Sequence, residues 1–170
     1  GTPRVGAPLS VVPGNWDDGV ALSYQWTVAG TAVPGATGTS YTPIVGDVGR
    51  TVAVQVTGTK TGYDPLTRTS ASTAPVAALS LAAGQCTVAV SGKARVGKRL
   101  AAVVASCPAG ASPGYQWYAG KAAIKGASGA TLKLKAKQAG KRIKVVVTVT
   151  VPGYLTDTRT SPPTKKVKRR

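Results

Sequence analysis

The chain has 170 residues, and its 22 Lys and Arg against 5 Asp and Glu give a formal net charge of +17 at pH 7. It contains no histidine and no glutamate, which excludes Ser–His–Asp and Cys–His catalysis. Its charge predicts attraction to polyanions: nucleic acid, acidic polysaccharide, teichoic-acid-like polymer or anionic membrane.

The predicted elements are short strands. Runs rich in Val, Thr and Tyr alternate with Gly and Pro, a pattern typical of an all-β chain with almost no helix. In the first half, strands are expected at 8–12, 22–28, 40–42, 51–59 and 66–76. Val52, Val54 and Val56 alternate with small or polar residues, so the fourth strand has one apolar face. Trp26 falls inside the second strand, and we expect its indole to be buried.

These features return 91 residues later. Tyr-Gln-Trp at 24–26 recurs at 115–117, and Thr-Arg-Thr-Ser at 67–70 recurs at 158–161. A period this long, held without a gap, predicts two copies of one folding unit. We therefore expect two tandem β-sandwich domains of about seven strands, residues 1–79 and 80–170, with Trp117 buried as Trp26 is.

The segment that joins the copies, residues 71–83, is expected to finish the last strand and form a short linker. No apolar run approaches the ~20 residues that span a membrane, and no signal peptide is visible. The chain begins within the repeat pattern, which favours a segment of a longer, already processed protein.

Cys86 and Cys107 both lie in the second copy. An even number of cysteines in a chain of extracellular composition predicts a disulfide, and two unpaired thiols are the alternative. A closed loop of roughly 20 residues adds about 3 kcal/mol in the chain-entropy model. Two cysteines without histidine make a poor zinc site, and no metal or cofactor is expected.

The order Arg-Val-Gly, Pro-Gly-Asn-Trp, Tyr-Gln-Trp, Gly-Ala-Thr-Gly, Asp-Val-Gly-Arg and Gly-Tyr resembles bacterial immunoglobulin-like repeats. These occur in secreted and surface proteins of Gram-positive, especially actinobacterial, bacteria. The resemblance covers both copies and implies an immunoglobulin-like sandwich in an extracellular protein. Such repeats serve as spacers, adhesion modules or polymer-binding appendages of secreted hydrolases, and the fold does not choose among these roles.

The two copies differ in charge. Residues 1–79 carry four basic and four acidic residues and are neutral, whereas residues 80–170 carry 18 basic residues against Asp157 alone. Lys133, Lys135 and Lys137 alternate with apolar residues, so on a strand they would share one face about 7 Å apart. The alternative is that these lysines keep an outer face solvated and protect strand edges.

The predicted polyanion-binding residues extend beyond this row to both neighbouring turns and the C-terminus. They are Lys121, Lys125, Lys133, Lys135, Lys137, Arg142, Lys144, Lys165, Lys166, Lys168, Arg169 and Arg170. A short basic tail such as 165–170 is usually disordered and makes nonspecific contacts with polyanions. Trp16 and Tyr118 are candidates for stacking on a sugar ring, although Trp16 is also expected to fold back over the end of its sandwich.

The sequence thus predicts a non-catalytic, secreted or cell-surface module, and an appendage of a secreted hydrolase is one form that such a module takes. The second copy would bind an anionic cell-envelope polymer or acidic polysaccharide. A purely mechanical spacer is the second hypothesis. Nonspecific nucleic-acid binding is the third, because lysines on strands and few exposed aromatics are unlike sequence-specific readers.

Overall fold

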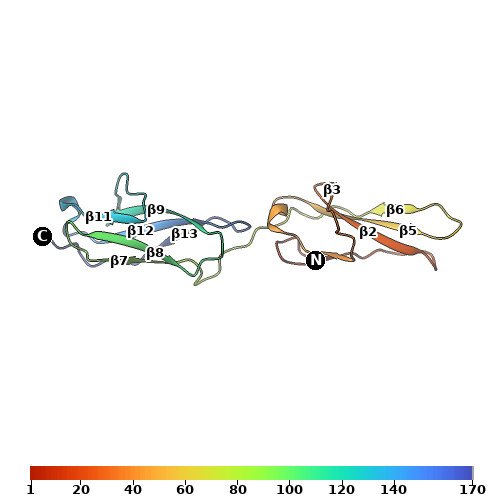
Figure 1. Ribbon diagram of the computed structural model, residues 1–170, viewed down its shortest axis with the longest axis horizontal. Helices are drawn as coiled ribbons and strands as arrows, with labels where there is room; N and C mark the ends of the chain where they lie inside the picture. The colour runs from red at the N-terminus through yellow and green to blue at the C-terminus, as the bar shows by residue number, and fades with distance from the viewer. Residues whose placement is uncertain (170) are drawn as a thin grey trace. The chain divides into compact units, whose positions relative to one another are not determined.

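Antiparallel β-strands build both halves of the chain in the computed structural model, which describes residues 1–169 (Figure 1). The chain separates into two compact units, Gly1–Leu79 and a second that begins at Ser80. Among the described residues, helix is confined to two three-residue 3-10 turns, Val45–Asp47 and Ala136–Gln138. The predicted all-β class is confirmed.

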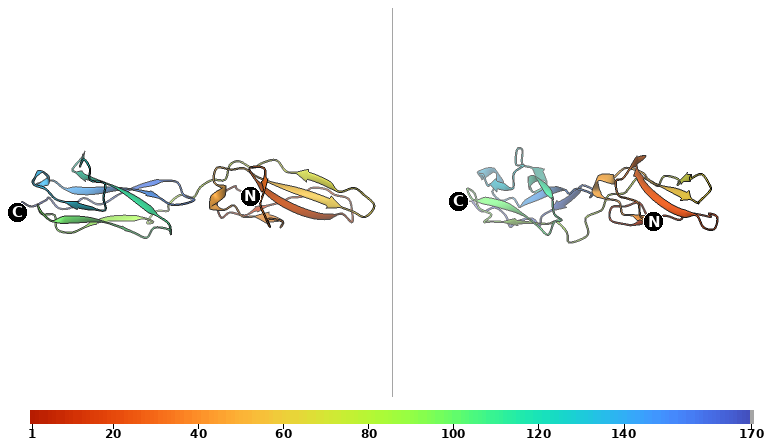
Figure 2. Two further views of the ribbon diagram at one scale, coloured as in Figure 1. Left: turned by 45° about the horizontal axis from the view of Figure 1, so that its top comes forward. Right: turned by 45° about the vertical axis from the view of Figure 1, so that its right-hand side comes forward.

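The second unit is a sandwich of two antiparallel sheets, which separate into layers in Figure 2. One sheet has the order β11-β8-β7 and the other β10-β9-β12-β13. The chain crosses from one sheet to the other after β8, after β10 and after β11, which is the connectivity of an immunoglobulin-like sandwich. The strands are β7 (Thr87–Ser91), β8 (Arg99–Ala105), β9 (Ser112–Ala119), β10 (Ala122–Ala123), β11 (Thr131–Lys133), β12 (Ile143–Thr150) and β13 (Asp157–Thr160).

The first unit repeats this plan with one strand fewer. Its sheets have the orders β3-β2-β5-β6 and β1-β4. Residues 1–79 thus contain six strands, where about seven were expected. The strands are β1 (Leu9–Ser10), β2 (Ala21–Val28), β3 (Thr31–Ala32), β4 (Ser40–Tyr41), β5 (Val52–Thr59) and β6 (Leu66–Thr69).

Each unit has its own apolar core between its sheets. Trp26 is 3% exposed and Trp117 is 0% exposed, so the predicted burial of both indoles is confirmed. The valines of β5 and β12 point inward at every second position, as their alternation predicts.

The repeated Tyr-Gln-Trp motif holds the loops that follow its strand. In the second unit, Nε1 of Trp117 donates to the carbonyl oxygen of Gly129 at 2.9 Å, and Nε2 of Gln116 donates to that of Ile124 at 3.0 Å. The matching bonds of the first unit join Trp26 to Gly38 and Gln25 to Val33. Because these loops carry the chain from β3 to β4 and from β10 to β11, the motif links the two sheets of each sandwich.

The last strand of each unit is interrupted, which corrects the expected strand 66–76. After β13 the partner of β12 is partly side chain, because the Val145 N–H donates to Oγ of Ser161 at 3.0 Å and the Ile143 N–H donates to Oγ1 of Thr164. β6 ends at Thr69, and Ser70 and Thr73 bond β5 in the same way.

The basic C-terminal segment is part of the sandwich as far as Lys168. This corrects the expectation of a disordered tail. Val167 is only 2% exposed, and its N–H donates to the Lys141 carbonyl oxygen at 2.9 Å. Lys168 forms a parallel bridge with Arg95. At the 91-residue offset Val167 matches Val76, which is equally buried. The apolar valine at this position draws the segment into the core despite its basic neighbours.

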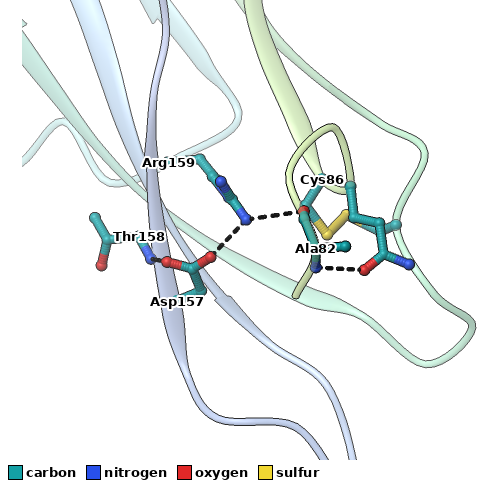
Figure 3. Close-up of polar contacts among 7 residues, drawn as sticks. Ala82, Cys86, Asp157, Thr158 and Arg159 are labelled. Atoms are coloured by element: carbon teal, nitrogen blue, oxygen red, sulfur yellow. Dashed lines mark hydrogen bonds and ion pairs between the residues drawn. A yellow bond between two sulfur atoms is a disulfide. The ribbon is translucent and has the colours of Figure 1, made fainter. Parts of the chain in front are cut away.

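The predicted disulfide between Cys86 and Cys107 is present. It joins the start of β7 to the segment that follows β8, just beyond the last paired residues of the two strands. Figure 3 shows Arg159 beside it, with Nη2 at 2.7 Å from Oδ2 of Asp157 and 3.4 Å from the Ala82 carbonyl oxygen. The disulfide and Arg159 thus both hold the residues that enter the second unit.

Candidate polyanion-binding surface

Lys133, Lys135 and Lys137 do not share one strand as expected. β11 ends at Lys133, Lys135 is extended, and Lys137 lies in the 3-10 turn. The cause is Gln138, whose side chain is buried and accepts the Lys135 N–H on Oε1 at 2.8 Å. The Gln138 N–H in turn donates to the Lys135 carbonyl oxygen. These two bonds end the extended backbone that begins with β11.

The resulting turn brings the three lysines around one cavity together with a fourth. A cavity of about 220 Å³ is lined by Lys125, Lys133, Lys135 and Lys137, all of which are exposed. We call these four residues the lysine cleft. Lys133 and Lys135 also line a wider depression of about 760 Å³, to which Arg169 contributes.

Lys125 reaches the cleft because its loop is bonded to the strand of the buried tryptophan. The Ile124 N–H donates to the Trp117 carbonyl oxygen at 2.8 Å, and the Trp117 N–H donates to that of Ala127 at 3.1 Å. Gly126 makes the turn between these two bonds with φ of +73°, a conformation that favours glycine. The position of Lys125 is therefore set by the core of the sandwich.

The charge of the cleft has little local compensation. Asp157 is the sole acidic side chain between residues 80 and 170, and its carboxylate pairs with Arg159. Within the second unit, no other carboxylate side chain is present to neutralise the cleft lysines. Ammonium groups gathered in a concave site of one sign concentrate anions from solution.

Other predicted binding residues lie on the other sheet. Lys144 is on β12, half-buried, and its Nζ lies 5.6 Å from the ring centre of Tyr118 on β9. Arg142 precedes β12 and its Nη1 donates to the Thr164 carbonyl oxygen at 3.4 Å. Lys121 lies in the turn between β9 and β10. None of these three lines the cavity of the lysine cleft.

The basic residues of the C-terminal segment are divided. Lys165, Lys166, Lys168 and Arg169 are exposed, and Arg169 lines the wider depression beside the cleft. Arg170 lies outside the described residues. The segment therefore extends the basic surface from a fixed backbone position, at least as far as the Lys168 bridge.

A basic side chain of the protein lies over the ring of each of the two candidate sugar-stacking aromatics, Trp16 and Tyr118. The Arg68 guanidinium lies 4.8 Å from the centre of the Trp16 ring, and the Trp16 ring packs directly against Gly58. Trp16 also donates from Nε1 to the Pro13 carbonyl oxygen at 2.9 Å. Tyr118 is half-buried beneath Lys144. Trp16 therefore packs onto the end of the first sandwich, in a cavity of about 210 Å³ that Lys60 and Tyr63 also line.

The sequence did not indicate Lys125 as a neighbour of Lys137, or the division of the other basic residues between two sheets. The signal for the position of Lys125 was the Gly126 turn nine residues after Trp117, which matches Gly35 after Trp26. Sequence alone carried no signal for the second.

Strand order and layering place each unit in the class of immunoglobulin-like β-sandwiches. No protein-family model matches the chain, and no curated protein matches it. The solved structure of the amphioxus IgVJ-C2 molecule is similar over 97% of this chain and 98% of that chain, with a TM-score of 0.45 and 13% sequence identity.

Two further findings concern residues 1–169. The structure there has no helix long and apolar enough to cross a membrane. Nor does it group three or more His, Cys, Asp or Glu side chains where they would hold a metal ion.

Proposed function

We propose that this chain is a non-catalytic tandem module of a secreted or cell-surface protein, and that its second unit binds an anionic polymer. The polymer is a cell-envelope polymer or an acidic polysaccharide. The observation that carries the proposal is the lysine cleft, four exposed lysines around one cavity in a unit whose only acidic side chain is paired elsewhere. The resemblance to repeats of Gram-positive bacteria supports an envelope polymer as the ligand.

The size of the cleft supports a polymer of small charged groups. Its volume of about 220 Å³ is below the roughly 300–1,000 Å³ of sites that enclose drug-sized ligands. It has room for one phosphate or carboxylate group, which lysine binds as a point charge. Neighbouring charges of the same polymer would meet Arg169 and the wider depression.

A non-catalytic role is supported by the few groups able to move protons. The chain has five aspartates and no histidine or glutamate. Asp157 pairs with Arg159, and Asp47 accepts hydrogen bonds from the Tyr41 hydroxyl and the Ile44 N–H. The disulfide supports an oxidising, extracellular location.

The neutral first unit favours a second candidate function, in which both units are spacers that position another domain. Both functions are compatible if the first unit is the spacer and the second the anchor. Nucleic-acid binding has less support. Proteins that bind single strands stack the bases on exposed aromatic rings. Here Arg68 lies over the Trp16 ring and Lys144 lies over the Tyr118 ring.

The test compares two triple variants of the whole chain with equal charge. Lys133→Gln, Lys135→Gln and Lys137→Gln remove three charges of the cleft, whereas Lys121→Gln, Arg142→Gln and Lys144→Gln remove three associated with the other sheet. Binding is measured to teichoic-acid-bearing cell walls, an acidic polysaccharide, a neutral glucan and duplex DNA at matched salt.

We expect the unaltered chain to bind one anionic polymer more tightly than DNA and to lose binding as salt rises, because exposed charges are screened beyond about 8 Å at physiological salt. The cleft variant should lose about tenfold in affinity, or ~1.4 kcal/mol. The control variant should lose much less. Equal losses in both variants would reduce the effect to overall charge, and no binding to any polymer would favour the spacer.

A further inference from the structure

Two pairs of basic residues lie directly opposite each other in the second unit. On the neighbouring strands β11 and β8, Lys133 pairs with Arg99. In the C-terminal segment, Lys168 forms a parallel bridge with Arg95. All four side chains are exposed, and the backbones of neighbouring strands are only about 4.8 Å apart. Like charges placed opposite each other in this way destabilise a sheet.

The first unit shows that the sandwich does not need either pair. At the 91-residue offset, the counterpart of the C-terminal pair is a bridge between Arg4 and Ala77. The counterparts of the pair on β11 and β8 are Pro8 and Thr42. Neither place in the first unit therefore sets two cations against each other. The fold does not require these like charges, and a bound anion would account for them.

Within the second unit, no carboxylate side chain is free to neutralise the two pairs. Asp157 is the sole acidic side chain there, and it pairs with Arg159. The guanidinium groups of Arg159 and Arg142 donate to carbonyl oxygens. Within residues 1–169, those of Arg95 and Arg99 form no such bond. Each of these two guanidinium groups therefore offers its five N–H donors to a ligand.

Both pairs border the wider depression of about 760 Å³. Lys133 lines it directly. Val96 and Arg169 also line it, and each directly follows a member of the C-terminal pair in the chain. Its volume lies within the roughly 300–1,000 Å³ of sites that take up small ligands. Because Lys133 and Lys135 line this depression and the lysine cleft alike, one chain of charged groups can occupy both.

Phosphate suits this arrangement better than carboxylate. The two cations of each pair approach a ligand from different backbone segments. The oxygens of a phosphate diverge tetrahedrally, so they can accept from a guanidinium fork and from a separate ammonium group. The two oxygens of a carboxylate lie in one plane, and a single guanidinium already binds both. A DNA duplex, which is stiff over about 50 nm, cannot bend its phosphates into the depression.

We propose that Arg95 and Arg99 build a second anion site, in which each like-charge pair holds one phosphate of a flexible phosphodiester polymer. This inference rests on the proposed polymer-binding function and names the anionic polymer as a phosphate-bearing one. The bound polymer continues from this site into the lysine cleft through Lys133. Its phosphates remove the repulsion within each pair, so binding stabilises the second unit.

The test uses the whole chain and long-chain inorganic polyphosphate, whose internal groups each carry one negative charge as a phosphodiester does. The double variant Arg95→Gln with Arg99→Gln removes one cation from each pair. The control, Lys121→Gln with Lys144→Gln, removes the same charge near the other sheet. We expect the arginine variant to lose about tenfold in affinity for polyphosphate and the control about threefold or less.

Thermal unfolding without ligand is the second measurement. Because the arginine variant no longer sets like charges against each other, its second unit should melt about 2–5 °C higher at low salt, although it binds more weakly. A side chain that only supported the fold would lower the melting temperature when removed. The variant Arg95→Lys with Arg99→Lys keeps the charges but loses the fork, so it should lose affinity without gaining stability.

The outcomes separate this inference from the proposed function. Equal losses in the arginine variant and the control, or no rise in melting temperature, would overturn the inference while the unaltered chain still binds polymer. Tighter binding to polygalacturonate than to polyphosphate would overturn phosphate as the recognised group. Tighter binding to phosphatidylglycerol vesicles would replace the polymer with a membrane surface. If the unaltered chain binds none of these probes, the proposed function fails and the inference fails with it.

Discussion

Half-buried Tyr41 and buried Asp47 form a polar contact that only the first unit has. The Tyr41 hydroxyl donates to Oδ2 of Asp47 at 2.6 Å, and its ring stacks on Trp26 with 5.8 Å between ring centres. Burial and the hydrogen bond to the Asp47 carboxylate raise the pKa of Tyr41 from 10.0 to about 12. In the second unit Leu132 and Gln138 occupy these positions, and the contact is replaced by apolar packing and an amide.

This contact predicts alkaline sensitivity in the first unit. Because the folded state holds the Tyr41 proton more tightly, the contribution to stability is complete below pH 10 and is lost as pH rises through about 12. Thermal unfolding of the unaltered chain and of Tyr41→Phe should be followed between pH 8 and 12. The stability difference between them should shrink over the upper half of this range. A constant difference would contradict the assignment.

Trp16 and Gly58 are a second residue-scale pair. A Cβ atom at Gly58 would overlap the Trp16 ring, so glycine is required there by the packed indole. The second unit has Cys107 and Val149 at the matching positions, and its end is closed by the disulfide. The two units therefore close the same end of the sandwich by different means.

The substitution Gly58→Val should displace the Trp16 ring and destabilise the first unit by about 1–3 kcal/mol. Combining it with Trp16→Ala should cost less than the sum of the two single changes, because the overlap exists only when both large side chains are present. A double-mutant cycle from denaturant unfolding measures this coupling. Additive costs would mean that the indole does not pack on Gly58.

At the scale of elements, serine and threonine hydroxyls continue the pairing of each long central strand after its last neighbour ends. Ser161 and Ser70 make the same pair of bonds, to Val145 and Val54. Their environments differ, since Ser161 is 3% exposed and Ser70 is exposed. The same hydrogen bond therefore exists once in the core and once in contact with solvent.

Removing these hydroxyls should have unequal effects. Ser161→Ala leaves the Val145 N–H buried without a partner, which costs about 1–3 kcal/mol. Ser70→Ala should cost less than about 1 kcal/mol because water can replace the hydroxyl. Chemical denaturation of each variant gives both values. Equal costs would show that burial does not decide the strength of this bond.

At the scale of the whole molecule, the two units share a fold and differ in charge and cross-linking. The first is neutral and closes its end with Trp16, while the second carries all of the net charge and the disulfide. The same arrangement of strands thus supports a neutral surface in one unit and a basic surface in the other. This difference supports the proposal that the first unit is a spacer and the second an anchor.

Reduction of the disulfide should affect one unit alone. Cys86 and Cys107 are separated by 21 residues, so their loss should cost the second unit about 3 kcal/mol. For a unit of this size the melting temperature falls by on the order of 10 °C. Calorimetry with and without reductant, and of Cys86→Ser with Cys107→Ser, should show one transition shifted and the other unchanged. A shift in both transitions would contradict the independence of the two units.

Much of the fold was predictable because it is encoded in local pattern. The alternating valines and the mid-strand tryptophans identified the core strands, and the repeat showed that the second copy would fold as the first does. The two-residue strands β3 and β10 were missed, since too few residues lie in each to show a period of two.

The lysine cleft was only partly predictable. The charge partition indicated the second unit and three of the four lysines that line the cleft, because charge is a property of composition. The 3-10 turn at Lys137 depends on where the Gln138 side chain finds its partner, which the spacing of residues does not reveal.

The sequence by itself determined that this protein is a repeated all-β unit with buried Trp26 and Trp117 and a basic second copy. Only the tertiary structure decided that Lys125 joins the cleft, that Lys144 lies on the other sheet, and that Val167 anchors the C-terminal segment. The physical reason is that the spacing and type of residues determine which face of a single strand is apolar or charged. Which strands become neighbours depends on hydrogen bonds and packing between residues far apart in the chain.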